Sequence, residues 1–146
     1  MSLQDPNLKM SKSHSDPGSR ILITDRPEEI LQKLMAAVTD STNAVSYDPK
    51  NRPAVSNLLH LLSHFDTQGR SPDELGKVHA TLGLGAFKKI VAETISIHLE
   101  PIRNRWQEVM REDDGAYIDH VERMGAKKAR ENADATMAIV KEAVGL

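Results

Sequence analysis

Residues 86–112, AFKKIVAETISIHLEPIRNRWQEVMRE, are the stretch that decides the fold class. Apolar side chains recur in it every three or four positions, which is the spacing of one face of an amphipathic helix. Pro101 lies inside the run, where it removes one backbone hydrogen bond and crowds the preceding turn, so a kink or break is expected near residues 97–99. The apolar positions are Phe87, Ile90, Val91, Ile95, Ile102, Trp106 and Val109.

Shorter helices are predicted before this stretch. One begins near Pro27, where Asp25 and Glu28 have the spacing of a capping box and proline suits a first turn. Others begin at Pro53 and after Ser71, which opens a second capping box. The sequence therefore predicts a mainly α protein, a helical bundle preceded by a flexible loop at its N-terminal end.

The segment after the long stretch completes the bundle. A final helix is predicted from about Ala116 to Ala143, with small residues along the middle of its apolar stripe. Because the connection between the two long helices is short, we expect them to pack antiparallel. The stripe comprises Ile118, Val121, Gly125, Ala129, Ala133, Val140 and Val144.

Composition limits the possible classes of function. A chain of 146 residues is the length of one domain, and its net charge of −2 argues against a generally basic nucleic-acid binder. The absence of cysteine excludes disulfides, a thiolate nucleophile and cysteine-ligated zinc. No run has the length of a membrane span, and the first residues resemble neither a signal peptide nor a transit peptide.

Two histidines have a spacing that metal sites use. His60 and His64 lie four residues apart and share a helix face. No carboxylate or third histidine stands at a supporting distance in the sequence, so we expect exposed polar positions and no metal site.

A cluster of lysines and hydroxyl side chains lies near the beginning of the chain. Lys9-Met10-Ser11-Lys12-Ser13 stands between Asp-Pro and Asp-Pro-Gly turn signals, which favour a loop. Ammonium groups, hydroxyls and unpaired backbone N–H groups together suit a polyphosphate. The alternative interpretation of such a short cluster is a polar, disordered tail.

A second basic cluster begins at Arg123, in the sequence RMGAKKAR, which holds four cations and no acid. Lys127 and Arg130 follow Arg123 at +4 and +7, so the three share a helix face away from the apolar stripe. Arg103 and Arg105 could extend this face from the preceding helix. A charged face is often only solvated, but a phosphate backbone is its natural partner when one exists.

The first cluster is identical to the second signature of the class I aminoacyl-tRNA synthetases, and further segments resemble the bacterial and organellar tryptophanyl members. The residues after the signature, His14 to Gly18, resemble fungal mitochondrial members most. The other matching segments occur in the same order as in the family: Ser2 to Pro6, Ala37 to Ser41, Tyr47 to Pro49, Val55 to Leu59, Glu100 to Arg103 and Ala143 to Leu146.

The resemblance implies a C-terminal portion of such an enzyme. Residues 1–20 would be the signature segment at the end of the catalytic domain, and residues 21–146 a helical tRNA-binding domain. ATP with Mg²⁺ would be the substrate, and Lys9 and Lys12 would act in catalysis by holding its phosphates. Ser11 would donate to the phosphates, Met10 would seat the loop, and the ATP-binding residues together would be Lys9, Met10, Ser11, Lys12 and Ser13.

The resemblance also implies partners. The helical domain would meet the anticodon arm of tRNA(Trp), tryptophan would be the amino-acid substrate, and the whole enzyme would be a homodimer without membrane attachment. The location would be the mitochondrial matrix, or the cytoplasm of a bacterium. The residues expected at the tRNA are Arg103, Arg105, Arg123, Lys127 and Arg130.

Activity of this chain by itself is not expected, because the family's nucleotide- and tryptophan-binding half would precede residue 1. Two other functions stay open at this point. One is a free-standing helical RNA-binding module that has lost catalysis, and the other is an assembly protein that uses its apolar helix faces.

Overall fold

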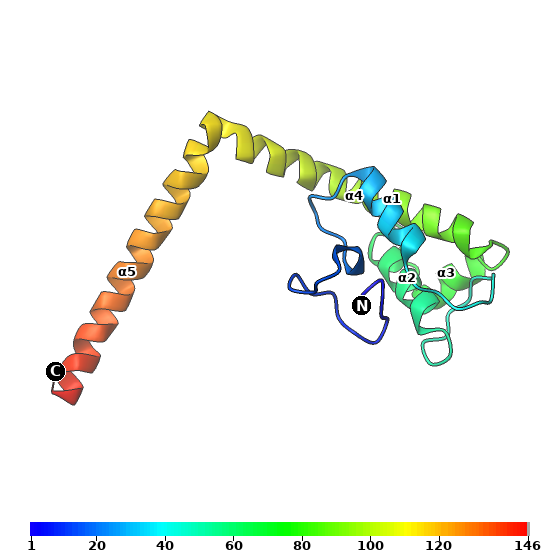
Figure 1. The fold of residues 1–146 in the computed structure, drawn as a ribbon, viewed down its shortest axis with the longest axis horizontal. Helices are drawn as coiled ribbons and strands as arrows, with labels where there is room; N and C mark the ends of the chain where they lie inside the picture. Colours follow the sequence, from blue (N-terminus) through cyan, green and yellow to red (C-terminus); the bar gives the residue numbers. More distant parts are fainter. Residues whose placement is uncertain (146) are drawn as a thin grey trace. The chain divides into compact units, whose positions relative to one another are not determined.

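The computed structural model describes residues 1–145, with only the backbone of Asp113, and this part of the chain contains helices and loops but no strand (Figure 1). The mainly α class is therefore confirmed. The chain divides into two compact units, Met1–Arg103 and the residues from Asn104 onward, and each is described by itself. The elements are η1 Pro17–Ser19, α1 Pro27–Ala36, α2 Pro53–His64, α3 Pro72–Val78, α4 Leu84–Arg111, η2 Glu112–Gly115 and α5 Ala116–Val144.

The first unit has a hydrophobic core built from the helices and from the loop residues Leu3, Ala37 and Val45. Leu3 and Val45 enter the core from loops, and each is only 2% exposed. Met10, Ile21 and Tyr47 pack against the core from outside. The helical core positions include Ile30, Leu34, Val55, Leu58, Leu59, Leu62, Leu75, Phe87, Val91 and Ile95.

Proline is the first residue of α1, α2 and α3, where its missing N–H leaves no helical bond unmade. The capping box predicted at Ser71 is confirmed: the Glu74 backbone N–H donates to Ser71 Oγ at 3.3 Å, and the Ser71 N–H donates to Glu74 Oε2 at 2.8 Å.

The capping arrangement predicted for α1 is wrong by one position. Arg26 is the N-cap, and its backbone N–H donates to Glu29 Oε2 at 2.7 Å. Asp25 instead lies buried, where its Oδ2 accepts from the Leu22 N–H and from Lys33 Nζ. Because Pro27 is the first helical residue, the carboxylate that reaches back to the cap must come from position 29 rather than 28.

α4 runs from Leu84 to Arg111 without interruption, so the helix does not break near residues 97–99, and the kink stays a prediction. Pro101 deprives the carbonyl of Ile97 of its helical donor, but Ile97 is 59% exposed and water can serve that carbonyl. The buried positions differ from the prediction beyond this point, because Leu99 and Arg103 are buried while Ile102 is half exposed. The buried row therefore continues in steps of four from Phe87 and ends on an arginine.

The second unit contains η2 and the long helix α5. Gly115, with φ of +90°, is the residue before α5, and a side chain there would be strained. No residue of α5 is buried, so its apolar stripe lies at the surface of this unit. Antiparallel packing of the two long helices stays a prediction.

None of the helices described combines the length and the hydropathy needed to cross a membrane.

The candidate phosphate-binding loop and the basic helix face

The signature residues lie on a loop whose two ends are joined. The Leu3 N–H donates to the Ser19 carbonyl at 2.9 Å, and both residues are buried. We call the segment between them, residues 4–18, the signature loop. The contact holds the loop closed at its base while most of its side chains face solvent.

Within the signature loop, the cations lie outward and one apolar side chain lies inward. Lys9 and Lys12 are exposed, and no ion pair found among residues 1–145 involves either of them. Met10 is half-buried against the hydrophobic core. The hydroxyls of Ser11 and Ser13 lie 3.0 Å apart. We call residues 9–13 the signature turn, which carries these two hydroxyls and two exposed ammonium groups.

The returning limb of the loop is held by its own polar groups. Asp16 Oδ1 accepts from the Gly18 N–H at 2.7 Å, which opens the short η1 turn. Arg20 Nη1 donates to the carbonyls of His14 and Asp16 at 3.0 and 3.2 Å. The loop thus has a defined return path, unlike the disordered tail of the alternative interpretation.

Two further polar residues of the first unit are buried, and neither was predicted from the sequence. Asn57 of α2 and Lys88 of α4 are 6% and 8% exposed. Lys88 Nζ donates to the carbonyls of Ala37 and Met35 at 2.7 and 3.3 Å, and burial lowers the pKa of its ammonium group. For Lys88 the available signal was helical spacing, because it lies four residues from the core positions Leu84 and Ala92.

The five predicted tRNA residues have different environments. Arg105 is exposed and pairs with Glu108 at 3.1 Å. Arg123, Lys127 and Arg130 are exposed on α5, where their spacing places them on one face.

Arg103 differs from the other four because it is only 6% exposed. Its Nη1 donates to the buried backbone carbonyl of Asp25 at 3.0 Å, which joins α4 to the segment before α1. Its guanidinium therefore holds the first unit together at this position and is not presented at the surface.

The two histidines of α2 are exposed, as predicted. The Nε2 of His60 lies 3.0 Å from the hydroxyl of Tyr47, and the two rings meet edge to face. Within the described residues, no three His, Cys, Asp or Glu side chains are grouped as metal ligands.

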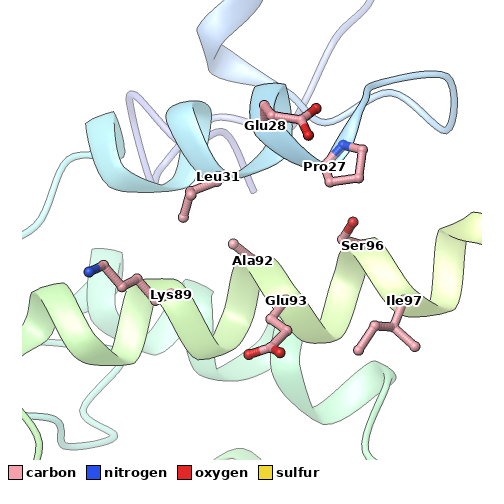
Figure 2. A pocket seen from close by; sticks show the side chains of 8 residues that line it. All are labelled: Pro27, Glu28, Leu31, Lys89, Ala92, Glu93, Ser96 and Ile97. Carbon is pink, nitrogen blue, oxygen red and sulfur yellow. The ribbon is translucent and has the colours of Figure 1, made fainter.

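A shallow groove of about 420 Å³ lies between α1 and α4, and Figure 2 shows its lining. Leu31, Ala92 and Ile97 make it largely apolar, and Glu28 and Glu93 are its acidic lining residues. No residue of the signature loop lines it, so it is separate from the candidate phosphate site.

The residues that the structure describes form a helical domain that carries a lysine- and serine-rich loop closed at its base. The family model for class I tRNA synthetases specific for tryptophan and tyrosine matches residues 1–100. The chain belongs to this family. The structural likeness agrees, since tryptophanyl-tRNA synthetase from Mycoplasma pneumoniae superimposes with a TM-score of 0.72 at 26% identity, over all of this chain and 43% of that one.

Curated relatives narrow the comparison to the tryptophan branch. The chain is 37% identical to tryptophan–tRNA ligase of Halalkalibacterium halodurans and 38% identical to that of Enterococcus faecalis, in both cases over all of its residues. It spans only 43% and 42% of the length of these relatives. Both are bacterial, so they lend no support to the expected closeness to fungal mitochondrial members or to a mitochondrial location.

Proposed function

We propose that this chain is the C-terminal part of a tryptophan–tRNA ligase and supplies that enzyme's phosphate-binding loop and a tRNA-facing helical domain. The observation that carries the proposal is the signature turn, with exposed Lys9 and Lys12 on a loop closed at its base. The bacterial relatives are named tryptophan–tRNA ligases, which supports tryptophan as the amino acid and its ligation to tRNA as the reaction.

In the proposed reaction, the carboxylate of tryptophan attacks the α-phosphate of ATP and pyrophosphate leaves. Negative charge grows on the leaving phosphates, and contacts that strengthen as it grows raise the rate. Lys9 and Lys12 would supply those contacts, and the hydroxyls of Ser11 and Ser13 would donate to the phosphate oxygens. Met10 would keep the turn seated against the core, where it already packs.

Magnesium is part of the proposal as the companion of ATP, because a divalent cation neutralises the triphosphate that the lysines approach. The exposed groups of the signature turn suit direct phosphate contacts rather than metal ligation, since ammonium groups do not bind cations. A homodimer is proposed for the whole enzyme.

The tRNA contact is proposed for Arg105, Arg123, Lys127 and Arg130. Exposure and common spacing on α5 favour the last three, since a row of cations on a helix can follow a phosphate backbone. Arg103 is left out of this set because its guanidinium is buried against the carbonyl of Asp25.

The test uses a full-length ligase, as long as the relatives, whose C-terminal part is this chain. The variant to be compared with the parent is Lys12→Ala. Loss of a charge-assisted phosphate contact should raise the barrier to tryptophanyl-adenylate formation by about 2 to 4 kcal/mol, by analogy with an oxyanion donor. The melting temperature should hardly change, because an exposed substitution alters stability by about 0.5 kcal/mol or less. The measurements are single-turnover adenylate formation and thermal unfolding.

Lys127→Ala is the matched control. It should spare adenylate formation and weaken tRNA binding, with a salt dependence that is shallower by about one phosphate contact. An unchanged rate of adenylate formation in Lys12→Ala would refute the proposed catalytic role. If tRNA binding persisted in a chain without any activation, the RNA-binding module would be the better description.

A further inference from the structure

The outgoing limb of the signature loop is attached to α2 through a single buried side chain. Asn57 Oδ1 accepts from the nitrogen of Met1 at 3.1 Å, and its Nδ2 donates to the carbonyls of Met1 and Ser2 at 3.2 and 3.3 Å. The amide therefore uses both its acceptor and its donor on the two residues that lead into the loop. Ser2 is itself only 4% exposed.

Ser2 passes this attachment into the signature loop. Its backbone N–H donates to the Leu8 carbonyl at 2.6 Å, and its hydroxyl accepts from the N–H groups of Gln4 and Asp5 at 3.2 and 3.3 Å. Leu8 directly precedes Lys9. The position of the first signature lysine thus depends on the residue that Asn57 holds.

A second chain of contacts ties the base of the loop to α1 and α4. The Val38 N–H donates to the Leu3 carbonyl at 2.9 Å, beside the contact between Leu3 and Ser19. Lys88 Nζ donates to the carbonyl of Ala37, the residue before Val38, at 2.7 Å. The loop is therefore anchored at its base to three helices, while the signature itself faces solvent.

We propose that Asn57 is a positioning residue for the signature loop. By fixing the outgoing limb of the loop, Asn57 holds Lys9 and Lys12 where they can contact the leaving phosphates. Lys88 supports the base of the same loop. The inference rests on the proposed function, because positioning matters only if the lysines contact phosphate. The physical reason is that a transition-state contact is lost when its donor is displaced by about 1 Å.

The experiment compares Asn57→Ala with the parent in the ligase of the relatives' full length. We expect the turnover number for adenylate formation to fall roughly 10- to 100-fold, with the Michaelis constant for tryptophan unchanged. Hydrogen exchange should accelerate in residues 2–19 and stay unchanged in α4. A variant that merely lost stability would accelerate exchange throughout the core instead.

The matched control is Asn43→Ala. Asn43 also uses its amide on the backbone, because its Oδ1 accepts from the Leu84 N–H at 2.8 Å at the start of α4. Exchange should then rise at the start of α4 and not in residues 2–19, and adenylate formation should be normal.

A third variant keeps the test decisive if Asn57→Ala fails to fold. Lys88→Met retains most of the apolar stem and removes the hydrogen bonds to the carbonyls of Met35 and Ala37, so it should produce the same local exchange and a fall in turnover of the same kind. Normal exchange in residues 2–19 together with normal turnover, in whichever of the two variants folds, would overturn the inference.

Failure of this inference can be told apart from failure of the proposed function. If Lys12→Ala lowers adenylate formation and Asn57→Ala does not, the lysines act at phosphate and only the positioning role is wrong. If Lys12→Ala has no effect, the proposed function fails, and the exchange data still report whether Asn57 holds the loop.

Discussion

At the scale of single residues, two arginines that lie two positions apart have opposite environments. Arg103 is 6% exposed and donates to the Asp25 carbonyl, whereas the side chain of Arg105 is 69% exposed and faces Glu108. A buried acceptor that loses its donor retains the full cost of its desolvation, while an exposed ion pair competes with water. The two side chains should therefore contribute very differently to stability.

We expect Arg103→Ala to lower the free energy of unfolding by about 1 to 3 kcal/mol, because it leaves the Asp25 carbonyl without a partner. Arg105→Ala should change the free energy of unfolding by less than about 0.5 kcal/mol. Urea unfolding of both variants measures the difference. Equal midpoints would mean that the buried hydrogen bond contributes nothing to stability.

At the scale of elements, the turn between α2 and α3 is held by an ion pair between Asp66 and Arg70. The Arg70 N–H donates to Asp66 Oδ2 at 2.8 Å, and Arg70 Nη2 lies 2.5 Å from Asp66 Oδ1. Gly69, with φ of +68°, makes the tight connection possible. Hydrogen bonds from the Arg70 side chain and then from its backbone lower the pKa of Asp66 from 3.8 to about 2.

This ion pair predicts a pH-dependent difference in melting temperature between Asp66→Asn and the parent. The carboxyl of Asp66 has a lowered pKa in the folded state, so its stabilisation is fully present above its ordinary pKa of 3.8 and is lost as the pH falls toward about 2. The variant should melt at a lower temperature near neutral pH, and the gap should close between these two values. Thermal unfolding at a series of pH values provides the measurement.

Asp73→Asn is the control for this pH dependence. Asp73 pairs with Lys77 across one turn of α3, but both side chains are more than half exposed, so little stability depends on the pair. The stabilising role of the Asp66–Arg70 ion pair would be contradicted by either of two results. One is a melting-temperature difference of the same size for Asp73→Asn, and the other is a difference for Asp66→Asn that persists at pH 2.

At the scale of the whole molecule, the chain corresponds to less than half of the ligases that it resembles. It spans 43% and 42% of the ligases from H. halodurans and E. faecalis. In the proposed reaction, the signature turn would supply groups for the leaving phosphates, but adenylate formation also requires that the tryptophan carboxylate be held in line with the α-phosphate. We propose that the signature turn serves only the phosphate side of this reaction.

We therefore expect the 146-residue chain to fold with a helix-dominated far-ultraviolet circular dichroism spectrum, yet to show no tryptophan-dependent ATP–pyrophosphate exchange above background. The first expectation follows from the core of α1, α2 and α4, and the second from the missing alignment of substrates. Exchange that disappeared in Lys12→Ala would disprove the second. A strand-dominated spectrum would disprove the first.

The sequence by itself determined the helical class and the residues that carry the proposed chemistry. The helix starts at Pro53 and Pro72, and the capping box at Ser71, depend on neighbouring residues alone, so local rules were sufficient. The signature could also be identified from the sequence, because Lys9 to Ser13 is one contiguous stretch. Its exposure agrees with the loop prediction.

Only the tertiary structure decided which polar residues are buried and what they hold. Asn57 and Lys88 bind carbonyls that lie 55 and 51 residues away in the sequence, and Arg103 reaches 78 residues back to Asp25. Helical periodicity marks a face of a helix but not what is packed against it, so the sequence alone places Arg103 among the surface cations. A buried polar group is stable only where the fold brings it a partner, and those partners come from distant parts of the chain.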